Sequence, residues 1–389
     1  METVHLLVHA PWPPAASSLG DIMIKNNDLH RKRKRKRENS GGATEGQTGW
    51  GHGSLGSSIS REYVKRCVGA VADQLEKSFP DAKIVLVPRK VSCTKDLDRY
   101  ARINAPRSIL FAFYFLWPTT FDDESSTTAA YSKGFVSAEK LFDLMEAHES
   151  MGCKTLFPHP VRLYRSITSK SWLVEASKDA SLAVVPTTSV KRGNLNAANV
   201  KAAALKLKSS SGALIAKLGF SWEGLDVRKC TSSTLEQTAK SLMFQQGSRA
   251  KQVFVQPFLD AVAEYRVFVI NGVVAHDYFA AYTSTLDDGT FCSFANIPES
   301  RIEAGGIDVS TVRSRGKYLA AKWYEWLQEL QPSLPAIRID FLLVSDDPDD
   351  CLVTLELTEL GFSMWNWSEG PKVVFEALGN YAVKLVNNK

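Results

Sequence analysis

The sequence predicts two fold classes in series, an α/β region followed by an α+β region, behind a disordered basic tail. Between residues 61 and 185, apolar strand-like runs alternate with helical segments, which is typical of a parallel sheet covered by helices. After Pro186 the strand-like runs come mostly in pairs joined by short turns, which is typical of antiparallel hairpins. Residues 1–60 are rich in Pro, Gly, Ser and basic residues, and they contain too little apolar surface to offset the entropy of ordering them.

The charge of the chain is concentrated in that tail. Seven consecutive cations, Arg31–Arg37, outweigh the formal net charge of +5, so that the other residues sum to −2. The run resembles a nuclear localisation signal and predicts an import receptor as a partner; the alternative is a solvated tail that touches RNA or anionic surfaces without specificity. Because the rest of the chain is slightly acidic, we expect no nucleic acid binding beyond the tail.

Two features of the composition predict an intracellular protein, in the nucleus, the cytoplasm or both. The six cysteines lie far apart and form no Cys-x-x-Cys pair, which favours reduced thiols over structural zinc or a disulfide framework. No segment approaches the roughly 20 apolar residues that span a bilayer, and the N-terminus lacks the pattern of a signal peptide. We therefore expect no membrane partner.

The predicted elements follow one another without a visible repeat. The α/β region is expected to contain a helix within 61–79, strands at 82–87, 108–117 and 155–157, and a helix at 137–146. The region after Pro186 is expected to begin with a helix at 197–207 and a strand at 213–217. Its later strands are predicted at 253–258, 265–270, 273–279, 337–344 and 352–357.

The last two of these strands carry acidic residues that predict a metal site. Alternate residues of a strand share a face, so Arg338 and Asp340 lie together. If Asp340 faces Glu356, then Val344 faces Leu352, and the two carboxylates are about 5 Å apart. Their repulsion, roughly 3 kcal/mol at an effective dielectric near 20, would be offset by a hard divalent cation. The alternative is a solvated face on which Arg338 neutralises one acid.

A second hairpin is centred on the dipeptide Asn271-Gly272, which favours a type I′ turn. Regular pairing from this turn sets Ile270 against Val273 and Arg266 against Asp277. The sequence therefore predicts a cross-strand ion pair between Arg266 and Asp277.

Lys217 is a candidate phosphate ligand. It ends an apolar strand and is followed by a glycine-containing turn over 218–224, where backbone N–H groups and an ammonium can converge on an anion. The glycines match no established nucleotide fingerprint, and a surface lysine beside a loop would look similar.

Together, these motifs resemble, in their order and spacing, the ATP-grasp superfamily, which includes D-alanine–D-alanine ligase, glutathione synthetase and tubulin–tyrosine ligase. The resemblance covers about the last 220 residues. It divides the chain into a tail (1–60), a pre-ATP-grasp α/β domain (61–185) and an ATP-grasp domain (186–389), with a small α+β lid at about 186–252 and an antiparallel central sheet at about 253–389. The matching segments are Ser169–Trp172, Val184–Thr188, Leu214–Lys217, Phe220–Gly224, Val253–Phe258, Glu264–Val267, Arg338–Phe341 and Glu356–Thr358.

The resemblance implies roles for particular residues. Nucleotide contacts would come from Lys170, Lys217, Gln256, Phe258, Glu264 and Arg338, and catalytic contacts from Arg338 and Lys217. Magnesium, or manganese, would be held by Asp340, Glu356 and Thr358. The family usually has Asn where this chain has Thr358, a weaker ligand, and Glu359 would point to the opposite face of a regular strand unless the strand bulges.

The implied activity is an ATP-dependent ligase that joins a carboxylate to an amine, or to a thiol, through an acyl phosphate. Its partners would be ATP and an unidentified carboxylate or amine substrate. One alternative is a non-ligating ATP-binding assembly factor of the cell-division-cycle type, to which the Trp-containing segment 362–369 is faintly similar. Packing of these aromatics on the sheet is the better explanation of the segment. A third reading is a nuclear nucleic-acid-binding protein led by the basic run.

Overall fold

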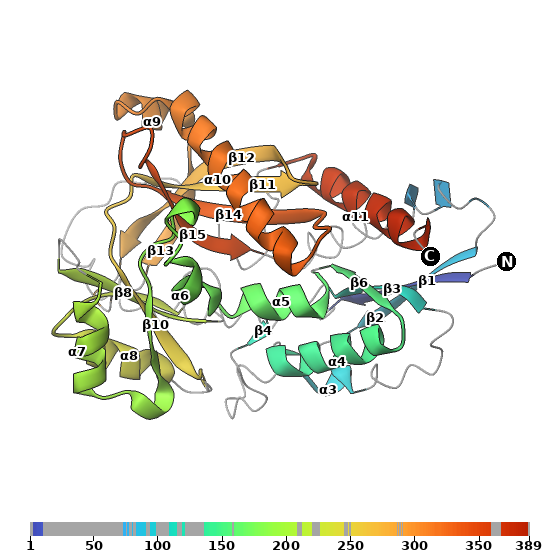
Figure 1. Ribbon diagram of the computed structural model, residues 1–389, viewed down its shortest axis with the longest axis horizontal. Helices are drawn as coiled ribbons and strands as arrows, with labels where there is room; N and C mark the ends of the chain where they lie inside the picture. The colour runs from blue at the N-terminus through green and yellow to red at the C-terminus, as the bar shows by residue number, and fades with distance from the viewer. Residues whose placement is uncertain are drawn as a thin grey trace, which may run out of the picture.

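A computed structural model of the chain provides the structure (Figure 1). It describes residues 3–10, 73–74, 76–77, 80, 83–90, 94–98, 109–114, 119–120 and 136–387, and within the last range it leaves out 158, 208–211, 220–225, 245–247, 249, 286, 288, 290 and 359–366. None of the helices within these ranges is both long and apolar enough to cross a membrane. The predicted helix at 61–79 lies mostly outside the described residues, as does the basic run.

The N-terminal region is a parallel sheet, as predicted, at one end of the molecule (Figure 1). Its strand order is β2-β1-β3-β6. The strands are β1 (Thr3–Ala10), β2 (Lys83–Lys90), β3 (Ile109–Tyr114) and β6 (Lys154–Phe157), with α3 (Thr94–Leu97), α4 (Ala138–Ser150) and a small parallel pair of β4 (Thr119–Thr120) with β5 (Val136–Ser137) beside them.

Strand β1 lies within the segment where we expected only a tail. Its sequence contains the apolar run Leu6-Leu7-Val8, which suits a central strand of a parallel sheet covered on both faces. It pairs along its whole length with β2, from Thr3 opposite Lys83 to Ala10 opposite Lys90. The prediction from composition missed this short strand because it was dominated by the prolines that come directly after β1.

The segment expected to be a lid, from β7 to β10 and called the lid below, forms an antiparallel sheet with two helices and a core of its own. Strand β10 was expected in the central sheet, but it lies in the lid between β7 and β8. The predicted helix and strand of the lid are present, whereas β9 and α8 were not predicted. The elements are β7 (Thr188–Lys191), α7 (Ala197–Leu205), β8 (Ala213–Leu218), β9 (Val227–Thr231), α8 (Leu235–Met243) and β10 (Gln252–Pro257).

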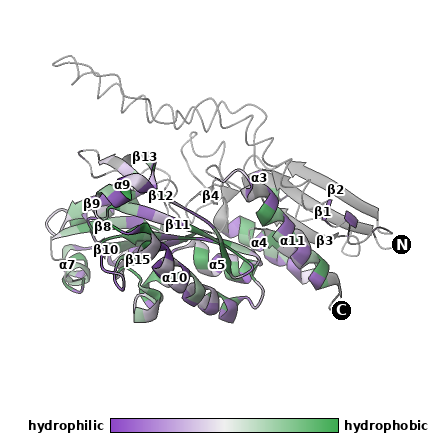
Figure 2. Cartoon of the chain, turned by 90° about the horizontal axis from the view of Figure 1, so that it is seen from above, coloured by the Kyte–Doolittle hydropathy of each residue, from purple (hydrophilic) through white to green (hydrophobic). Residues whose placement is uncertain are grey.

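The central sheet is antiparallel in the order β13-β12-β11-β14-β15. It follows the lid in sequence and lies above both other sheets in Figure 1. Green predominates on its strands in Figure 2 because they form the main core. The elements are β11 (Ala263–Ile270), β12 (Val273–Thr285), β13 (Phe291–Ile297), β14 (Ala336–Leu343) and β15 (Leu352–Thr358), with helices α5 (Val161–Thr168), α6 (Trp172–Ala176), α9 (Glu299–Ala304), α10 (Val309–Leu330) and α11 (Gly370–Asn387).

Helix α10 packs closely on the central sheet. The ring of Tyr265 stacks on Phe279 with centroids 4.9 Å apart. A Cβ on Gly316 of α10 would lie 2.5 Å from Cε1 of Tyr265, so only glycine fits at this point of the helix.

Two register shifts change pairings that regular strands would have. In the first, a shift between Phe268 and Val269 sets Arg266 opposite Tyr278, so the predicted pair of Arg266 with Asp277 is wrong. Asp277 instead accepts a hydrogen bond of 3.1 Å from Nε of Arg313 on α10.

The second shift lies between Asp340 and Phe341. The predicted pairing of Asp340 with Glu356 is confirmed. Leu343, and not Val344, faces Leu352, because the shift removes one residue from the expected alignment.

The segment that enters the lid is fixed to β15 by Thr354. The backbone N–H of Thr354 donates to the carbonyl of Ala183 (2.6 Å), and its carbonyl accepts from the N–H of Val185 (3.4 Å). Its hydroxyl donates to the carbonyl of Leu182 (2.7 Å) and accepts from Nε1 of Trp323 (2.9 Å). This fully buried threonine therefore ties the lid entry, α10 and β15 together.

Candidate functional site

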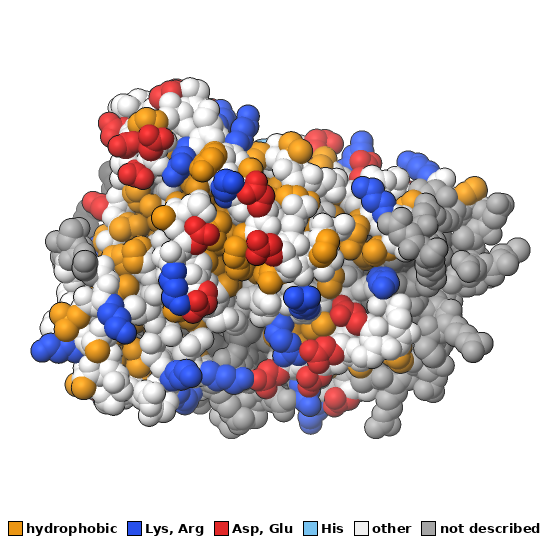
Figure 3. Space-filling view, in the orientation of Figure 1, with side chains coloured by type: hydrophobic (Ala, Val, Ile, Leu, Met, Phe, Trp, Pro, Cys, Tyr) orange, Lys and Arg blue, Asp and Glu red, His pale blue; other side chains and the backbone are white. Residues whose placement is uncertain are grey.

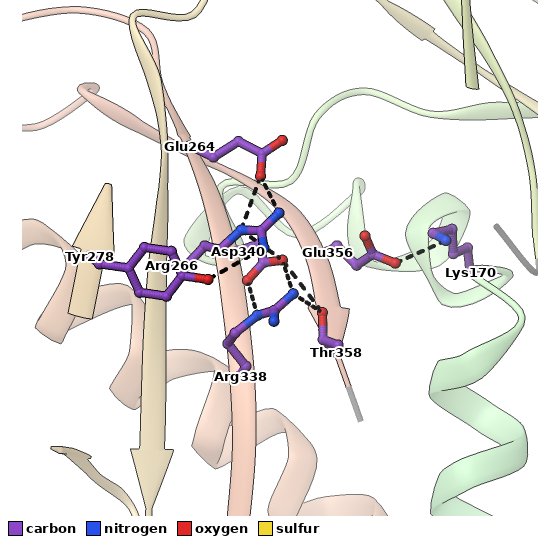
Figure 4. A network of polar contacts seen from close by, with 8 residues as sticks. All are labelled: Lys170, Glu264, Arg266, Tyr278, Arg338, Asp340, Glu356 and Thr358. Carbon is purple, nitrogen blue, oxygen red and sulfur yellow. Dashed lines mark hydrogen bonds and ion pairs between the residues drawn. The ribbon is translucent and has the colours of Figure 1, made fainter. Parts of the chain in front are cut away.

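Charged and polar side chains from five chain segments converge at one end of the central sheet (Figure 4). They include six of the residues singled out in the sequence, and two, Arg266 and Tyr278, that had no such role. Their sources are β11, β12, β14, β15 and the turn between α5 and α6. The set is Lys170, Glu264, Arg266, Tyr278, Arg338, Asp340, Glu356 and Thr358.

Asp340 is the most enclosed acid of this cluster. Its side chain is 2% exposed, and both of its oxygens accept from Arg338, Oδ1 from Nε (2.7 Å) and Oδ2 from Nη2 (2.8 Å). Nε of Arg266 lies 3.8 Å from Oδ2. Burial alone would favour the neutral acid, but the guanidinium groups of Arg338 and Arg266 outweigh it, and the pKa of Asp340 lies below its ordinary value. The carboxylate is therefore ionised.

Glu264 is held by Arg266. Its Oε2 accepts from Nη2 (2.7 Å) and Nε (3.1 Å) of Arg266, whose Nη1 donates to the hydroxyl of Tyr278 at 3.4 Å. Burial raises the pKa of Glu264, which the charge of Arg266 only partly offsets. Arg266 thus bridges Glu264, two residues earlier on the same strand, and Asp340, its cross-strand neighbour on β14.

Lys170 lies in the turn between α5 and α6 with a backbone φ of 56°, an unfavourable conformation for a residue with a side chain. Its side chain is buried and pairs with Oε1 of Glu356 at 2.9 Å. A Cβ on Gly219, just after β8, would overlap the carbonyl oxygen of Ser169. The lid strand thus approaches the Lys170 turn closely enough to require glycine.

Lys217 is buried beside this turn, with 3% of its surface exposed. Burial, and then the neighbouring charge of Lys170, lower the pKa of its ammonium to about 7, although Glu356 and Glu264 act in the opposite direction. An anion bound beside Lys217 would favour the charged form of its ammonium.

Gln256 and Phe258 take part in other contacts. Nε2 of Gln256 donates to the hydroxyl of Thr187 at 2.8 Å, and Nζ of Lys229 lies 3.5 Å from the ring centroid of Phe258. Both residues lie where β10 leads out of the lid towards β11. In the described part of the chain they do not enter the charged cluster.

Asp340, Glu356 and Thr358 offer oxygen ligands of the kind that magnesium binds. Asp340 and Glu356 are cross-strand neighbours, and the hydroxyl of Thr358 lies 3.4 Å from Oδ2 of Asp340. Among the described residues, no group of three or more His, Cys, Asp and Glu is arranged to hold a metal. One or two carboxylates suffice for magnesium when substrate phosphates complete its shell, so these residues fit that ion in the presence of a phosphate ligand. Glu359 lies outside the described residues.

His159 is a buried polar residue that the sequence did not indicate. It follows β6 at the carboxyl end of the parallel sheet and is 1% exposed. Among the described residues, neither of its ring nitrogens has a hydrogen-bond partner. Burial lowers the pKa of its imidazole from the ordinary 6.5 to about 3.

Replacing His159 by leucine is expected to stabilise the protein and to flatten its stability profile at acid pH. The unfolded chain binds a proton at His159 between pH 6.5 and about 3 and the folded chain does not, so stability falls as the pH drops through this window. Two desolvated nitrogens without partners also cost roughly 1–3 kcal/mol at pH 7. Urea unfolding between pH 4 and 8 measures both effects. His276→Leu, which loses the ring contact with Trp367, is the control and should lower the stability of the protein. Wild type and His159→Leu with the same dependence of stability on pH would contradict the expectation.

Trp367 packs on the central sheet, as the packing explanation of segment 362–369 predicted. Its ring stacks on His276 (centroids 5.0 Å apart) and contacts Phe268 (5.2 Å). Residues 362–366 lie outside the described part of the chain.

Neither a family model nor a curated protein sequence matches this chain. Solved structures do resemble it in fold. D-cycloserine synthetase DcsG has 14% identity and a TM-score of 0.59, over 97% of this chain and 99% of that one. D-alanine–D-alanine ligase from Bacillus anthracis, also solved in complex with ATP, has 10% identity and a TM-score of 0.55, over 100% and 99%. A RimK domain protein ATP-grasp from Sphaerobacter thermophilus has 14% identity and a TM-score of 0.50, over 82% and 94%.

Proposed function

We propose, on the premise that this chain has the ATP-grasp fold, that it is an ATP-dependent ligase which joins a carboxylate to an amine or a thiol. The observation that supports this proposal is the convergence of two buried lysines, Lys170 and Lys217, on a carboxylate pair formed by Asp340 and Glu356. A triphosphate with a bound divalent ion would satisfy such a site, since the lysines attract the phosphate oxygens and the carboxylates attract the ion.

Each charged residue has a place in the proposed reaction. Lys170, Lys217 and Arg338 neutralise the phosphate oxygens, and Asp340 and Glu356, with Thr358, would hold magnesium or manganese. The metal would supply charge stabilisation at the transferred phosphoryl group. Glu264 would meet the ribose, and Gln256 and Phe258 the adenine at the hinge.

The proposed chemistry needs mainly positioning and charge stabilisation from the protein. A substrate carboxylate oxygen attacks the γ-phosphorus, the bond to the β–γ bridging oxygen breaks, and ADP leaves with an acyl phosphate formed. The amine or thiol then attacks the acyl carbon, loses its proton, and releases inorganic phosphate. The lid, which brings Lys217 and Gly219 against the Lys170 turn, would exclude the water that would otherwise hydrolyse the acyl phosphate.

Binding to nucleic acid is not part of this proposal. On the face shown in Figure 3, Lys and Arg side chains are interspersed with Asp and Glu and with hydrophobic groups, and do not form a continuous basic surface. Such a mixed surface does not favour a polyanion over other partners.

The test has two stages. First, the melting temperature is measured with ATP or ADP, with and without magnesium; if neither nucleotide raises it, the nucleotide site is wrong. Second, ADP and phosphate release is measured with pairs drawn from a panel of carboxylates and amines. Release that needs both members of a pair supports a ligase, whereas nucleotide binding without release for any pair supports a non-ligating ATP-binding protein.

A further inference from the structure

We propose, resting on the nucleotide site inferred above, that the metal site is closed in the nucleotide-free protein by the protein's own cations, and that the nucleotide opens it. Metal and nucleotide would then bind interdependently, each weakly without the other.

Arg338 occupies the ligand atoms of two of the three metal-binding residues. Both carboxylate oxygens of Asp340 accept from its guanidinium, at 2.7 and 2.8 Å. Its Nη2 also lies 3.2 Å from the hydroxyl of Thr358, which in turn lies 3.4 Å from Oδ2 of Asp340. A divalent ion and the guanidinium compete for these oxygens, because both are positive, both are attracted to the same carboxylate, and each repels the other at this distance.

Lys170 acts in the same way on the third residue. Its ammonium lies 2.9 Å from Oε1 of Glu356, and it is held there by a buried turn of unfavourable backbone conformation. In the nucleotide-free state, then, each acid of the pair is neutralised by its own cation. The two cations offset the repulsion between Asp340 and Glu356, which are cross-strand neighbours.

Burial makes the closure strong. The side chains of Arg338 and Asp340 are 7% and 2% exposed, so their pairing is little screened by water. Breaking it for a metal alone would leave a buried guanidinium without a partner, at the cost known for half of a buried ion pair.

A phosphate chain removes that penalty. Its oxygens offer Arg338 and Lys170 new anionic partners and release the carboxylates to the metal. Asp340 keeps a second cation throughout, because Arg266 lies 3.8 Å from its Oδ2 and is itself held by Glu264. The exchange therefore gives each charge a new partner and leaves no buried charge unpaired. Because binding free energies are linked, the metal must strengthen nucleotide binding by the same factor by which the nucleotide strengthens metal binding.

The test measures binding of manganese to the full chain by electron paramagnetic resonance, alone and with ADP, after subtraction of the manganese that ADP holds in protein-free samples. Wild-type protein is expected to bind manganese about tenfold or more tightly with ADP than without it. Arg338→Gln is expected to bind manganese alone about tenfold or more tightly than wild type, because the guanidinium of residue 338 no longer competes for the oxygens of Asp340 and Thr358. Arg313→Gln, which removes an arginine paired with Asp277 and Glu299 elsewhere, is the matched control and should leave manganese binding unchanged.

Two results would overturn the proposal: wild-type protein that binds manganese alone as tightly as with ADP, or Arg338→Gln with unchanged affinity for manganese alone. The second arm uses no nucleotide, so it remains decisive if ADP fails to bind and the proposed function itself fails. Circular dichroism checks the fold of each variant. If Arg338→Gln does not fold, Lys170→Met, which frees Glu356, takes its place with the same expected increase.

Discussion

Asp340→Asn is expected to abolish the magnesium-dependent part of the stabilisation by ATP. The substitution keeps the size of the side chain but removes the only acid of the cluster that is buried to 2% exposure, and with it the charge that would attract the metal. ATP binding through Lys170 and Lys217 remains possible, so some stabilisation without magnesium should persist. The measurement is the melting temperature with ATP, with and without magnesium.

The same substitution should lower the stability of the nucleotide-free protein. Arg338 is buried and loses its ionised partner, and breaking half of a buried ion pair costs roughly 3–5 kcal/mol. Asp346→Asn is the matched control, because Asp346 is exposed in the turn between the same two strands. A wild-type magnesium response in Asp340→Asn would exclude Asp340 as a metal ligand.

Lys217→Met is expected to weaken ATP binding by roughly 10- to 100-fold, as measured by titration calorimetry, since a charge-assisted contact in a buried site contributes about 1.5–3 kcal/mol.

The binding of ATP is also expected to change the protonation of Lys217, which titration calorimetry in buffers of different ionisation enthalpy measures. With the pKa of Lys217 lowered to about 7, the free protein at pH 8 mostly lacks this proton, and the arriving phosphates should draw it in. Wild-type protein should therefore take up a proton with ATP, and Lys217→Met should not.

The stability of the nucleotide-free protein has the corresponding pH dependence. Below pH 7 Lys217 is charged in both the folded and the unfolded chain, and its burial costs most. Between about 7 and 10.5 only the unfolded chain keeps the proton, so the stability of the wild type rises with pH relative to Lys217→Met. Lys206→Met, at an exposed site in the lid, is the control. A constant difference between wild type and Lys217→Met over this range would show that Lys217 titrates normally.

The sequence was most informative where charge and strand periodicity coincide. Asp340 and Glu356 could be placed opposite one another because each lies in an apolar strand and a short polar turn joins them. The pairing of Arg338 with Asp340 had been expected only on a solvated face, whereas the structure places this pair in a buried position.

Partners across a register shift could not be predicted in this way. Nothing in the order of residues marks the shift between Phe268 and Val269, which arises from packing of the whole sheet. Arg266 therefore had the wrong expected partner, and its bridging of Glu264 and Asp340 was missed. His159 was missed for a related reason: a single histidine after a strand has no pattern, and only the fold shows that both of its nitrogens are enclosed.

The bond between the hydroxyl of Thr354 and the carbonyl of Leu182 joins residues 172 positions apart. During synthesis, the segment entering the lid leaves the ribosome long before β15 exists to receive it. The lid can form its own core from residues 190–255 in the meantime, because its contacts are more local. Folding is thus expected to end with the arrival of β15, and since Glu356 and Thr358 lie on that strand, a nascent or truncated chain would have a finished lid over an unfinished site.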